Sequence, residues 1–107
     1  MIVRIWRTRV DPKRAAEYER FAQEQSLPMF QSQDGFLGVL FTRSGVDRVV
    51  ASFWIDEAAV ARLGDSPSYD QTVARIEAAG FLVGSSSVEA LTVHGGFLAP
   101  EMLTKLS

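Results

Sequence analysis

Hydrophobic and polar residues alternate along the first segment of the chain, residues 2–10. Val3 and Ile5 fall on one side of an extended backbone, and Arg4 and Trp6 fall on the other. A two-residue period in a segment rich in β-branched and aromatic residues is typical of a β-strand. We therefore expect the chain to open with a strand.

A helix is expected to follow, from Asp11 to about Gln25. Asp11 can cap the free amides of the first turn, and Pro12 has the backbone angle that this turn requires. Apolar side chains then recur at spacings of three and four residues. Leu27 and Pro28 are predicted to end the helix, because a residue before proline avoids helical angles.

Two further strands are predicted, at residues 36–43 and 48–55, after a connector that covers residues 29–35. They are separated by the short segment 44–47, which contains Gly45. Two apolar runs joined by a few small or polar residues are typical of an antiparallel hairpin.

Two capping signals follow the hairpin. Asp56 is expected to begin a short helix that ends at Gly64, and Ser66 a longer helix that ends at Ala79. Residues 88–94 then have the composition of a fourth strand. The remaining tail could form one short helix from Pro100 onward.

The predicted element order is β-α-β-β-α-α-β, the split β-α-β or ferredoxin-like arrangement of an α+β fold. It implies a four-stranded antiparallel sheet with helices on one face. A chain of 107 residues is one domain. We assign this domain to residues 1–94 and treat residues 95–107 as a C-terminal tail.

The uncovered face of this sheet should be polar, yet the strand pattern is apolar on both sides. Residues 36–41 are apolar at both alternating positions, with Gly38 as the one interruption. Large exposed apolar patches are uncommon on monomers. We expect a homodimer that packs sheet against sheet through the open face, and the 95–107 tail could pack on the partner. The alternatives are a monomer with an exposed face, or a tail that folds back as the cover.

Composition excludes several classes of function. The chain has no cysteine, which excludes disulfides, thiolate metal sites and thiol catalysis, and its one histidine cannot form an ordinary metal site. A net charge of −2 argues against a nucleic-acid partner. The apolar runs are too short to span a membrane, and no secretory signal opens the chain. We expect a cytoplasmic protein without metal or cofactor.

Several short motifs, in order, are similar to a known family: IVRIWR at residues 2–7, Asp34-Gly35-Phe36, Ser52-Phe53-Trp54, Ser66-Pro67-Ser68-Tyr69, and Leu91-Thr92-Val93-His94. Over residues 1 to about 94 the chain resembles the antibiotic biosynthesis monooxygenase domain family of the dimeric α/β-barrel superfamily. The resemblance implies a ferredoxin-like dimer. It also implies an activity such as oxidation of aromatic phenols by dioxygen without metal or flavin.

Other members of that family cleave haem with an asparagine, a tryptophan and a histidine. Trp6, Leu63 and Val73 occupy those positions here, so the resemblance makes haem degradation unlikely. Quinone-forming members use a tryptophan, an asparagine and an arginine. This chain has no asparagine, so that set is also incomplete.

Four polar or aromatic side chains are the candidates for binding and chemistry. Arg4 could hold an anionic or enolate-like group, with Trp6 stacking on a flat ring. Tyr69 could donate a hydrogen bond to a substrate oxygen, and His94 could accept a proton near neutral pH. Each of these residues also has a structural alternative. Arg4 could form an ion pair, for which Glu89 is a candidate partner. Trp6 and Tyr69 could belong to the core, and His94 could lie at the end of a strand on the rim.

Phe41, Phe53 and Trp54 are the remaining candidate substrate-binding residues. They could form the walls of a pocket expected between the sheet and the two helices that follow the hairpin. Each of them can equally be core, and for Trp54 packing beneath the following helix is the stronger interpretation. The resemblance thus implies a monooxygenase-like protein acting on a small aromatic or polyketide-like compound. The alternative is a non-catalytic dimeric module that holds a small apolar ligand.

Overall fold

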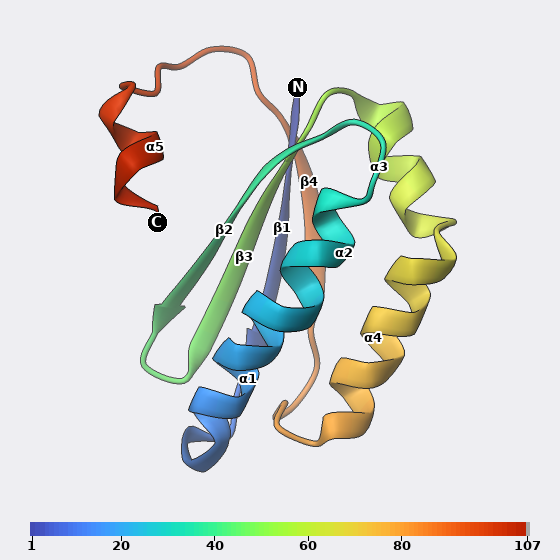
Figure 1. Ribbon diagram of the computed structural model, residues 1–107, viewed down its shortest axis with the longest axis vertical. Coiled ribbons are helices and arrows are strands. Elements are labelled where there is room, and N and C mark those ends of the chain that lie inside the picture. The colour runs from blue at the N-terminus through green and yellow to red at the C-terminus, as the bar shows by residue number, and fades with distance from the viewer. Residues whose placement is uncertain (107) are drawn as a thin grey trace.

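The computed structural model describes residues 1–106 and has the predicted ferredoxin-like architecture (Figure 1). Its four strands form one antiparallel sheet in the order β2-β3-β1-β4. The strands are β1 (Ile2–Arg9), β2 (Phe36–Ser44), β3 (Asp47–Trp54) and β4 (Ser87–Thr92). The predicted hairpin between the second and third strands is therefore confirmed.

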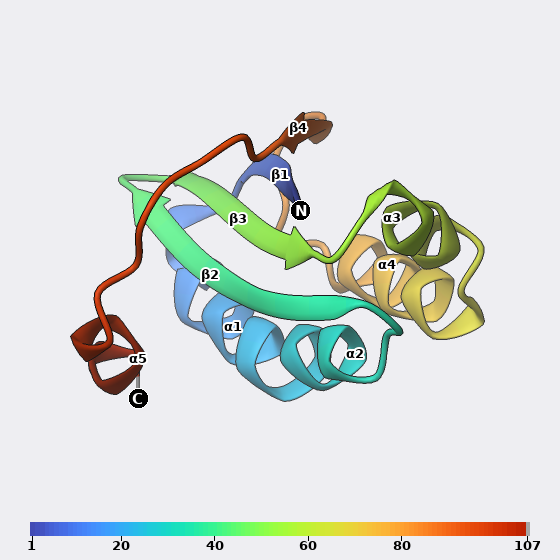
Figure 2. The same cartoon turned by 90° about the horizontal axis from the view of Figure 1, so that it is seen from above.

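The helices before the tail cover one face of this sheet, and the other face is open (Figure 2). They comprise η1 (Pro12–Arg14), α1 (Ala15–Phe21), the π-helical segment η2 (Ala22–Ser26), α2 (Leu27–Gln31), α3 (Glu57–Gly64) and α4 (Pro67–Ala79). A last helix, α5 (Glu101–Lys105), confirms the expected tail helix and lies beyond β2, away from the others. No helix within residues 1–106 is long and apolar enough to cross a membrane.

The predicted end of the first helix is wrong. The chain stays helical past Leu27 and Pro28 to Gln31, because the π-helical segment η2 interrupts the regular hydrogen-bond pattern: the Leu27 amide reaches back to the Ala22 carbonyl. Pro28 then lies in the first turn of α2, where its missing N–H costs nothing. The extension buries Met29 and Phe30, which the sequence analysis had placed in a connector.

The predicted end of the last strand is also wrong. β4 ends at Thr92, and the last ladder contact beyond it is the Val93 amide donating to the Met1 carbonyl at 3.0 Å. The sheet partner β1 begins at Ile2, and the ladder between the two strands ends at the pair of Ile2 and Thr92. His94 therefore lies past the strand, with an exposed side chain.

Both predicted helix caps downstream of the hairpin are confirmed. The Ala59 amide donates to the Asp56 carboxylate at 2.9 Å, and the Tyr69 amide donates to the Ser66 hydroxyl at 3.4 Å. These local bonds fix where α3 and α4 start, and so set the position of Tyr69 above the sheet.

Two apolar clusters form the core between the sheet and the helices. Trp54 and Leu63 lie in the first, under α3 and α2; Val10, Tyr18 and Phe81 lie in the second, near α1. Half-buried Trp6 packs against both clusters from the middle of β1. Trp6 therefore lies where the two clusters meet.

The open face carries a continuous set of half-exposed apolar side chains from all four strands, which are Val3, Ile5, Leu40, Val49, Ala51, Phe53 and Leu91. The tail does not cover them, because its own apolar side chains are exposed: Phe97 is 85% accessible and Leu103 76%. Figure 2 shows the tail leaving the end of β4 and placing α5 beyond the edge of the sheet.

Candidate functional site

A cavity of about 140 Å³ lies between the helix side of the sheet and the helices. A space of this size can hold a single aromatic ring. Side chains from β1, α1, η2, α2, β3, α4 and the segment before β4 line it: Arg4, Trp6, Tyr18, Ser26, Met29, Phe30, Val50, Tyr69, Thr72, Val73, Ile76, Glu77, Leu82 and Ser86. The lining is largely apolar, with a few polar groups, as is usual for small-molecule sites.

Arg4 and Tyr69 form the polar centre of this cavity. The Arg4 Nη2 donates to the Tyr69 hydroxyl oxygen at 2.6 Å, and the guanidinium carbon lies 5.3 Å from the centre of the Tyr69 ring. Because the Tyr69 oxygen accepts this bond, its own O–H remains available as a donor. The two side chains come from β1 and from the first turn of α4.

The Arg4 charge is buried without a carboxylate partner. Arg4 is only 8% exposed, and no ion pair among residues 1–106 involves it. Glu89, the candidate partner from the sequence, pairs instead with Arg7 on the open face at 2.7 Å. A buried charge is costly unless it is compensated. An anionic ligand in the cavity would supply the missing compensation.

Trp6 and Tyr18 form an aromatic wall beside this polar pair. Their rings are stacked, with centroids 6.5 Å apart and an interplanar angle of 21°. Burial raises the pKa of the Tyr18 hydroxyl to about 12, against a smaller opposing effect of the Arg48 charge. Tyr18 therefore stays neutral at any physiological pH.

Three predicted site residues converge on the cavity and four do not. Arg4, Trp6 and Tyr69 line it. The other four, His94, Trp54, Phe53 and Phe41, lie elsewhere.

His94 is exposed beyond β4 and does not line the cavity. Trp54 is fully buried in the core, where its indole N–H donates to the Ser52 hydroxyl at 2.9 Å. Phe53 alternates with it and faces the open side, so neither lines this cavity. Phe41 faces the helices but lines a different cavity.

Sequence reasoning missed Tyr18 as part of the site, although that residue lies within the predicted first helix. It also missed Met29 and Phe30, because the helix was expected to end before them. Thr72 and Glu77 follow Tyr69 at spacings of three and eight residues along α4. A helical period counted from Tyr69 was the available signal for Thr72.

The cavity contains no histidine, and Glu77 is its one carboxylate. Within residues 1–106, no group of three histidine, cysteine or acidic side chains is close enough together to hold a metal ion. Of the three positions compared with haem-cleaving relatives, Trp6 and Val73 line the cavity and Leu63 is buried in the core.

Solved structures with this arrangement of strands and helices include several oxygenases. A monooxygenase from the gene ActVA-Orf6 of Streptomyces coelicolor, in complex with the ligand nanaomycin D, matches with a TM-score of 0.78 at 20% sequence identity, over 92% of this chain and 91% of that one. SnoaB, a cofactor-independent oxygenase from Streptomyces nogalater, matches with a TM-score of 0.72 at 20% identity, over 89% of this chain and 94% of that one.

A proposed antibiotic biosynthesis monooxygenase from Caulobacter crescentus matches with a TM-score of 0.75 at 20% identity, over 88% of this chain and 90% of that one. This chain has the same fold as these oxygenases. The resemblance drawn from the sequence motifs is thus confirmed at the level of the fold. No protein-family model and no curated protein sequence matches the chain.

Proposed function

We propose that the protein is a cytoplasmic, homodimeric, monooxygenase-like enzyme that acts on a small aromatic or polyketide-like compound without a cofactor. The observation that carries this proposal is the buried Arg4, which shares its polar contact with Tyr69 and has no carboxylate partner. The monooxygenase fold and the single-ring size of the cavity agree with it.

Arg4 and Tyr69 would bind the oxygen of a phenol or enol. The guanidinium stabilises the negative charge that develops on that oxygen, and the Tyr69 O–H adds a hydrogen bond to it. Trp6 would stack on the ring. Holding the conjugate base in this way makes the substrate electron-rich enough to react with dioxygen.

The balance of such a reaction needs no external reductant. At the methylene group of an anthrone-type substrate, two C–H bonds break and a carbonyl forms. One atom of O₂ enters that carbonyl and the other leaves as water, while the substrate supplies the four electrons. We assign His94 no role in the reaction within its own chain's cavity, since its side chain lies outside that cavity.

The homodimer is supported by the open face of the sheet. Apolar side chains such as Ile5, Leu40 and Phe53 form a patch there that no helix and no part of the tail up to residue 106 covers. A second copy would cover this patch through an isologous interface. The exposed Phe97 and Leu103 of the tail would then pack on the partner.

Oxygen uptake with a panel of hydroquinones and anthrones tests the enzymatic proposal. The wild type should consume oxygen with at least one compound. Arg4→Met should lower kcat/KM by about 10²-fold or more, the usual cost of losing one donor to a developing oxyanion. Arg20→Gln, an exposed charge change on α1, is the matched control and should leave turnover unchanged.

A non-catalytic binding module is the second candidate, favoured by a cavity lining that offers Glu77 as its one acidic group and no histidine. In that case the same compounds bind and Arg4→Met weakens their binding, but no oxygen is consumed. A folded wild-type protein that neither binds nor oxidises any member of the panel would contradict both candidates.

A further inference from the structure

A second cavity, of about 240 Å³, lies at the turn end of the β2–β3 hairpin, beneath α1. It is more polar than the first and is lined by Tyr18, Glu19, Ala22, Gln23, Phe41, Thr42, Arg43 and Arg48. Arg4, Trp6 and Tyr69 do not line it, and Tyr18 lines both cavities. Two arginines and one glutamate supply its charge.

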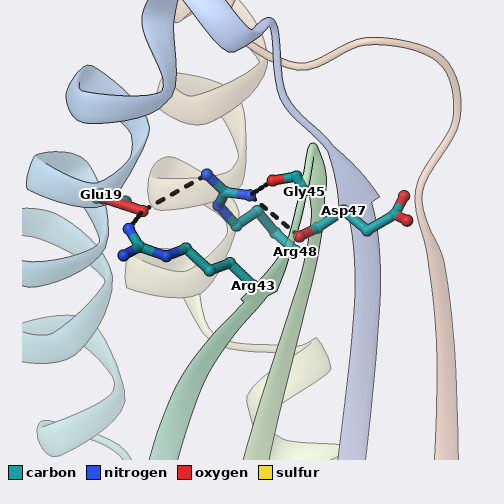
Figure 3. A network of polar contacts seen from close by, with 5 residues as sticks. All are labelled: Glu19, Arg43, Gly45, Asp47 and Arg48. Atoms are coloured by element: carbon teal, nitrogen blue, oxygen red, sulfur yellow. Dashed lines mark hydrogen bonds and ion pairs between the residues drawn. The ribbon is translucent and has the colours of Figure 1, made fainter.

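The two arginines lie directly opposite each other in the sheet register, with Arg43 on β2 and Arg48 on β3. Like charges in this cross-strand position destabilise a sheet unless an anion separates them. Both reach the same oxygen, Oε1 of Glu19: Arg43 Nη1 at 2.6 Å and Arg48 Nη2 at 3.5 Å (Figure 3). One carboxylate therefore serves two guanidinium groups, which leaves an excess positive charge.

Arg48 is incompletely satisfied although it is buried. Its side chain is only 5% exposed. Its Nη1 donates to the Gly45 and Asp47 carbonyls at 2.7 and 3.1 Å, whereas its Nε has no hydrogen-bond partner. Leaving a buried N–H unpaired costs about 1–3 kcal/mol, so this edge of the guanidinium favours an acceptor.

The incompletely paired edge of the Arg48 guanidinium has a specific shape. Nε and Nη2 present two N–H bonds side by side, the arrangement that binds a carboxylate through both of its oxygens. In this structure the edge makes one long contact to Glu19 and none at Nε. Arg43, which is 69% exposed, is the side chain with the freedom to move and admit a ligand.

We propose that this second cavity binds a small carboxylate ligand. The ligand carboxylate pairs with the Nε and Nη2 edge of Arg48 and with Arg43, and displaces Glu19 from Arg48. The apolar part of the ligand packs against Phe41, Tyr18 and Ala22, which form the apolar part of the lining. Phosphate can bind the same edge through two of its oxygens, but it has no apolar part to cover these side chains, so the lining favours a carboxylate that carries an apolar group.

Titration of the 107-residue chain with benzoate, followed by ¹H–¹⁵N spectra of the arginine side chains, tests the proposal. The Nε–H signal of Arg48 is assigned by its disappearance in Arg48→Lys. This signal should shift saturably with benzoate, and should not shift with benzamide, which has a similar shape and no charge. Inorganic phosphate should compete weakly.

Three variants make the test quantitative. Arg43→Gln should weaken benzoate binding by about fivefold, because it removes one of the two charge-assisted contacts. Glu19→Gln should strengthen it by a similar factor, because the competing carboxylate is lost. Arg20→Gln, also on α1 but absent from the cavity lining, should change nothing.

Several outcomes would overturn the proposal. These are equal binding of benzamide and benzoate, binding of phosphate in place of benzoate, or an Arg48 Nε–H that contacts water only and does not shift. Weaker benzoate binding in Glu19→Gln would also overturn it, since that result makes Glu19 part of the site. If Arg48→Lys fails to fold, the exposed Arg43→Gln variant still decides the question.

Discussion

The guanidinium of Arg4 lies among apolar side chains with a hydroxyl group as its polar partner. A structural arginine in the middle of a sheet normally has a carboxylate nearby, as Arg7 has in Glu89. Arg4 has Tyr69 instead, at 2.6 Å. This difference between two arginines of one strand is the residue-level basis of the proposed oxyanion site.

Tyr18 links the two cavities, because it lines both. Burial raises the pKa of its hydroxyl to about 12 in the folded chain, above the ordinary value of 10.0. Between these two pH values the unfolded chain loses the proton and the folded chain keeps it, so folding becomes less favourable as pH rises. Below the lower value the hydroxyl is neutral in both states and has no such effect.

Tyr18→Phe should therefore flatten the alkaline part of the stability profile. The wild type should lose about 2 kcal/mol of unfolding free energy through this group as the pH rises from 10 to 12, and the variant should not. Urea unfolding at a series of pH values measures the difference. The same alkaline loss in both proteins would show that the Tyr18 hydroxyl is not responsible.

At the scale of elements, Gly35 allows the start of β2 to lie close against α3. It has a positive φ of 82°, and a Cβ there would lie 2.6 Å from the Ala59 Cβ and 2.9 Å from the Ile55 Cγ2. Gly45, in the hairpin turn, also has a positive φ, 58°, but no atom lies within 4 Å of its Cβ position. A Cβ at position 45 would therefore cause backbone strain alone, whereas a Cβ at position 35 would cause both backbone strain and steric overlap.

Gly35→Ala should destabilise the fold more than Gly45→Ala does. Backbone strain alone costs about 1–2 kcal/mol at each position, and the overlap with α3 should bring the Gly35 variant to roughly 3 kcal/mol or more. Unfolding in urea measures both variants. Equal losses would mean that α3 moves aside freely.

Element positions were predictable from sequence wherever the signal is local. Asp56 and Ser66 cap helices through bonds to amides three residues away, and such bonds depend on the sequence alone. The helix that continues past Pro28 was not predictable in this way, because burial of Met29 and Phe30 stabilises it. Tertiary packing outweighed the local preference of the residue before proline.

The site was predictable only in part, for the same reason. Strand alternation placed Arg4 and Trp6 on one face, and the cap at Ser66 brought Tyr69 above them. His94 was assigned to a strand that ends two residues earlier. The pairing of Arg43 with Arg48 depends on the hairpin register, which the sequence left open.

At the scale of the whole molecule, the open sheet face should hold two copies together. Ile5 lies at its centre, on β1 between β3 and β4. Ile5→Asp should give a monomer, because a charge buried at an apolar interface is costly. Analytical ultracentrifugation measures the mass, and Gln71→Asp, on exposed α4 surface, is the control. A monomeric wild type at micromolar concentration would contradict the homodimer.

The central claim is that the Arg4–Tyr69 cavity stabilises an aromatic oxyanion. The most direct test is the pKa of para-nitrophenol bound to the protein, read from the visible absorbance of its phenolate. A cation close to the phenol oxygen should lower that pKa by about 1 or more relative to water. Arg4→Met should abolish the lowering while the protein stays folded. A bound phenol that ionises as in water, or an equal lowering in Arg4→Met, would contradict the account.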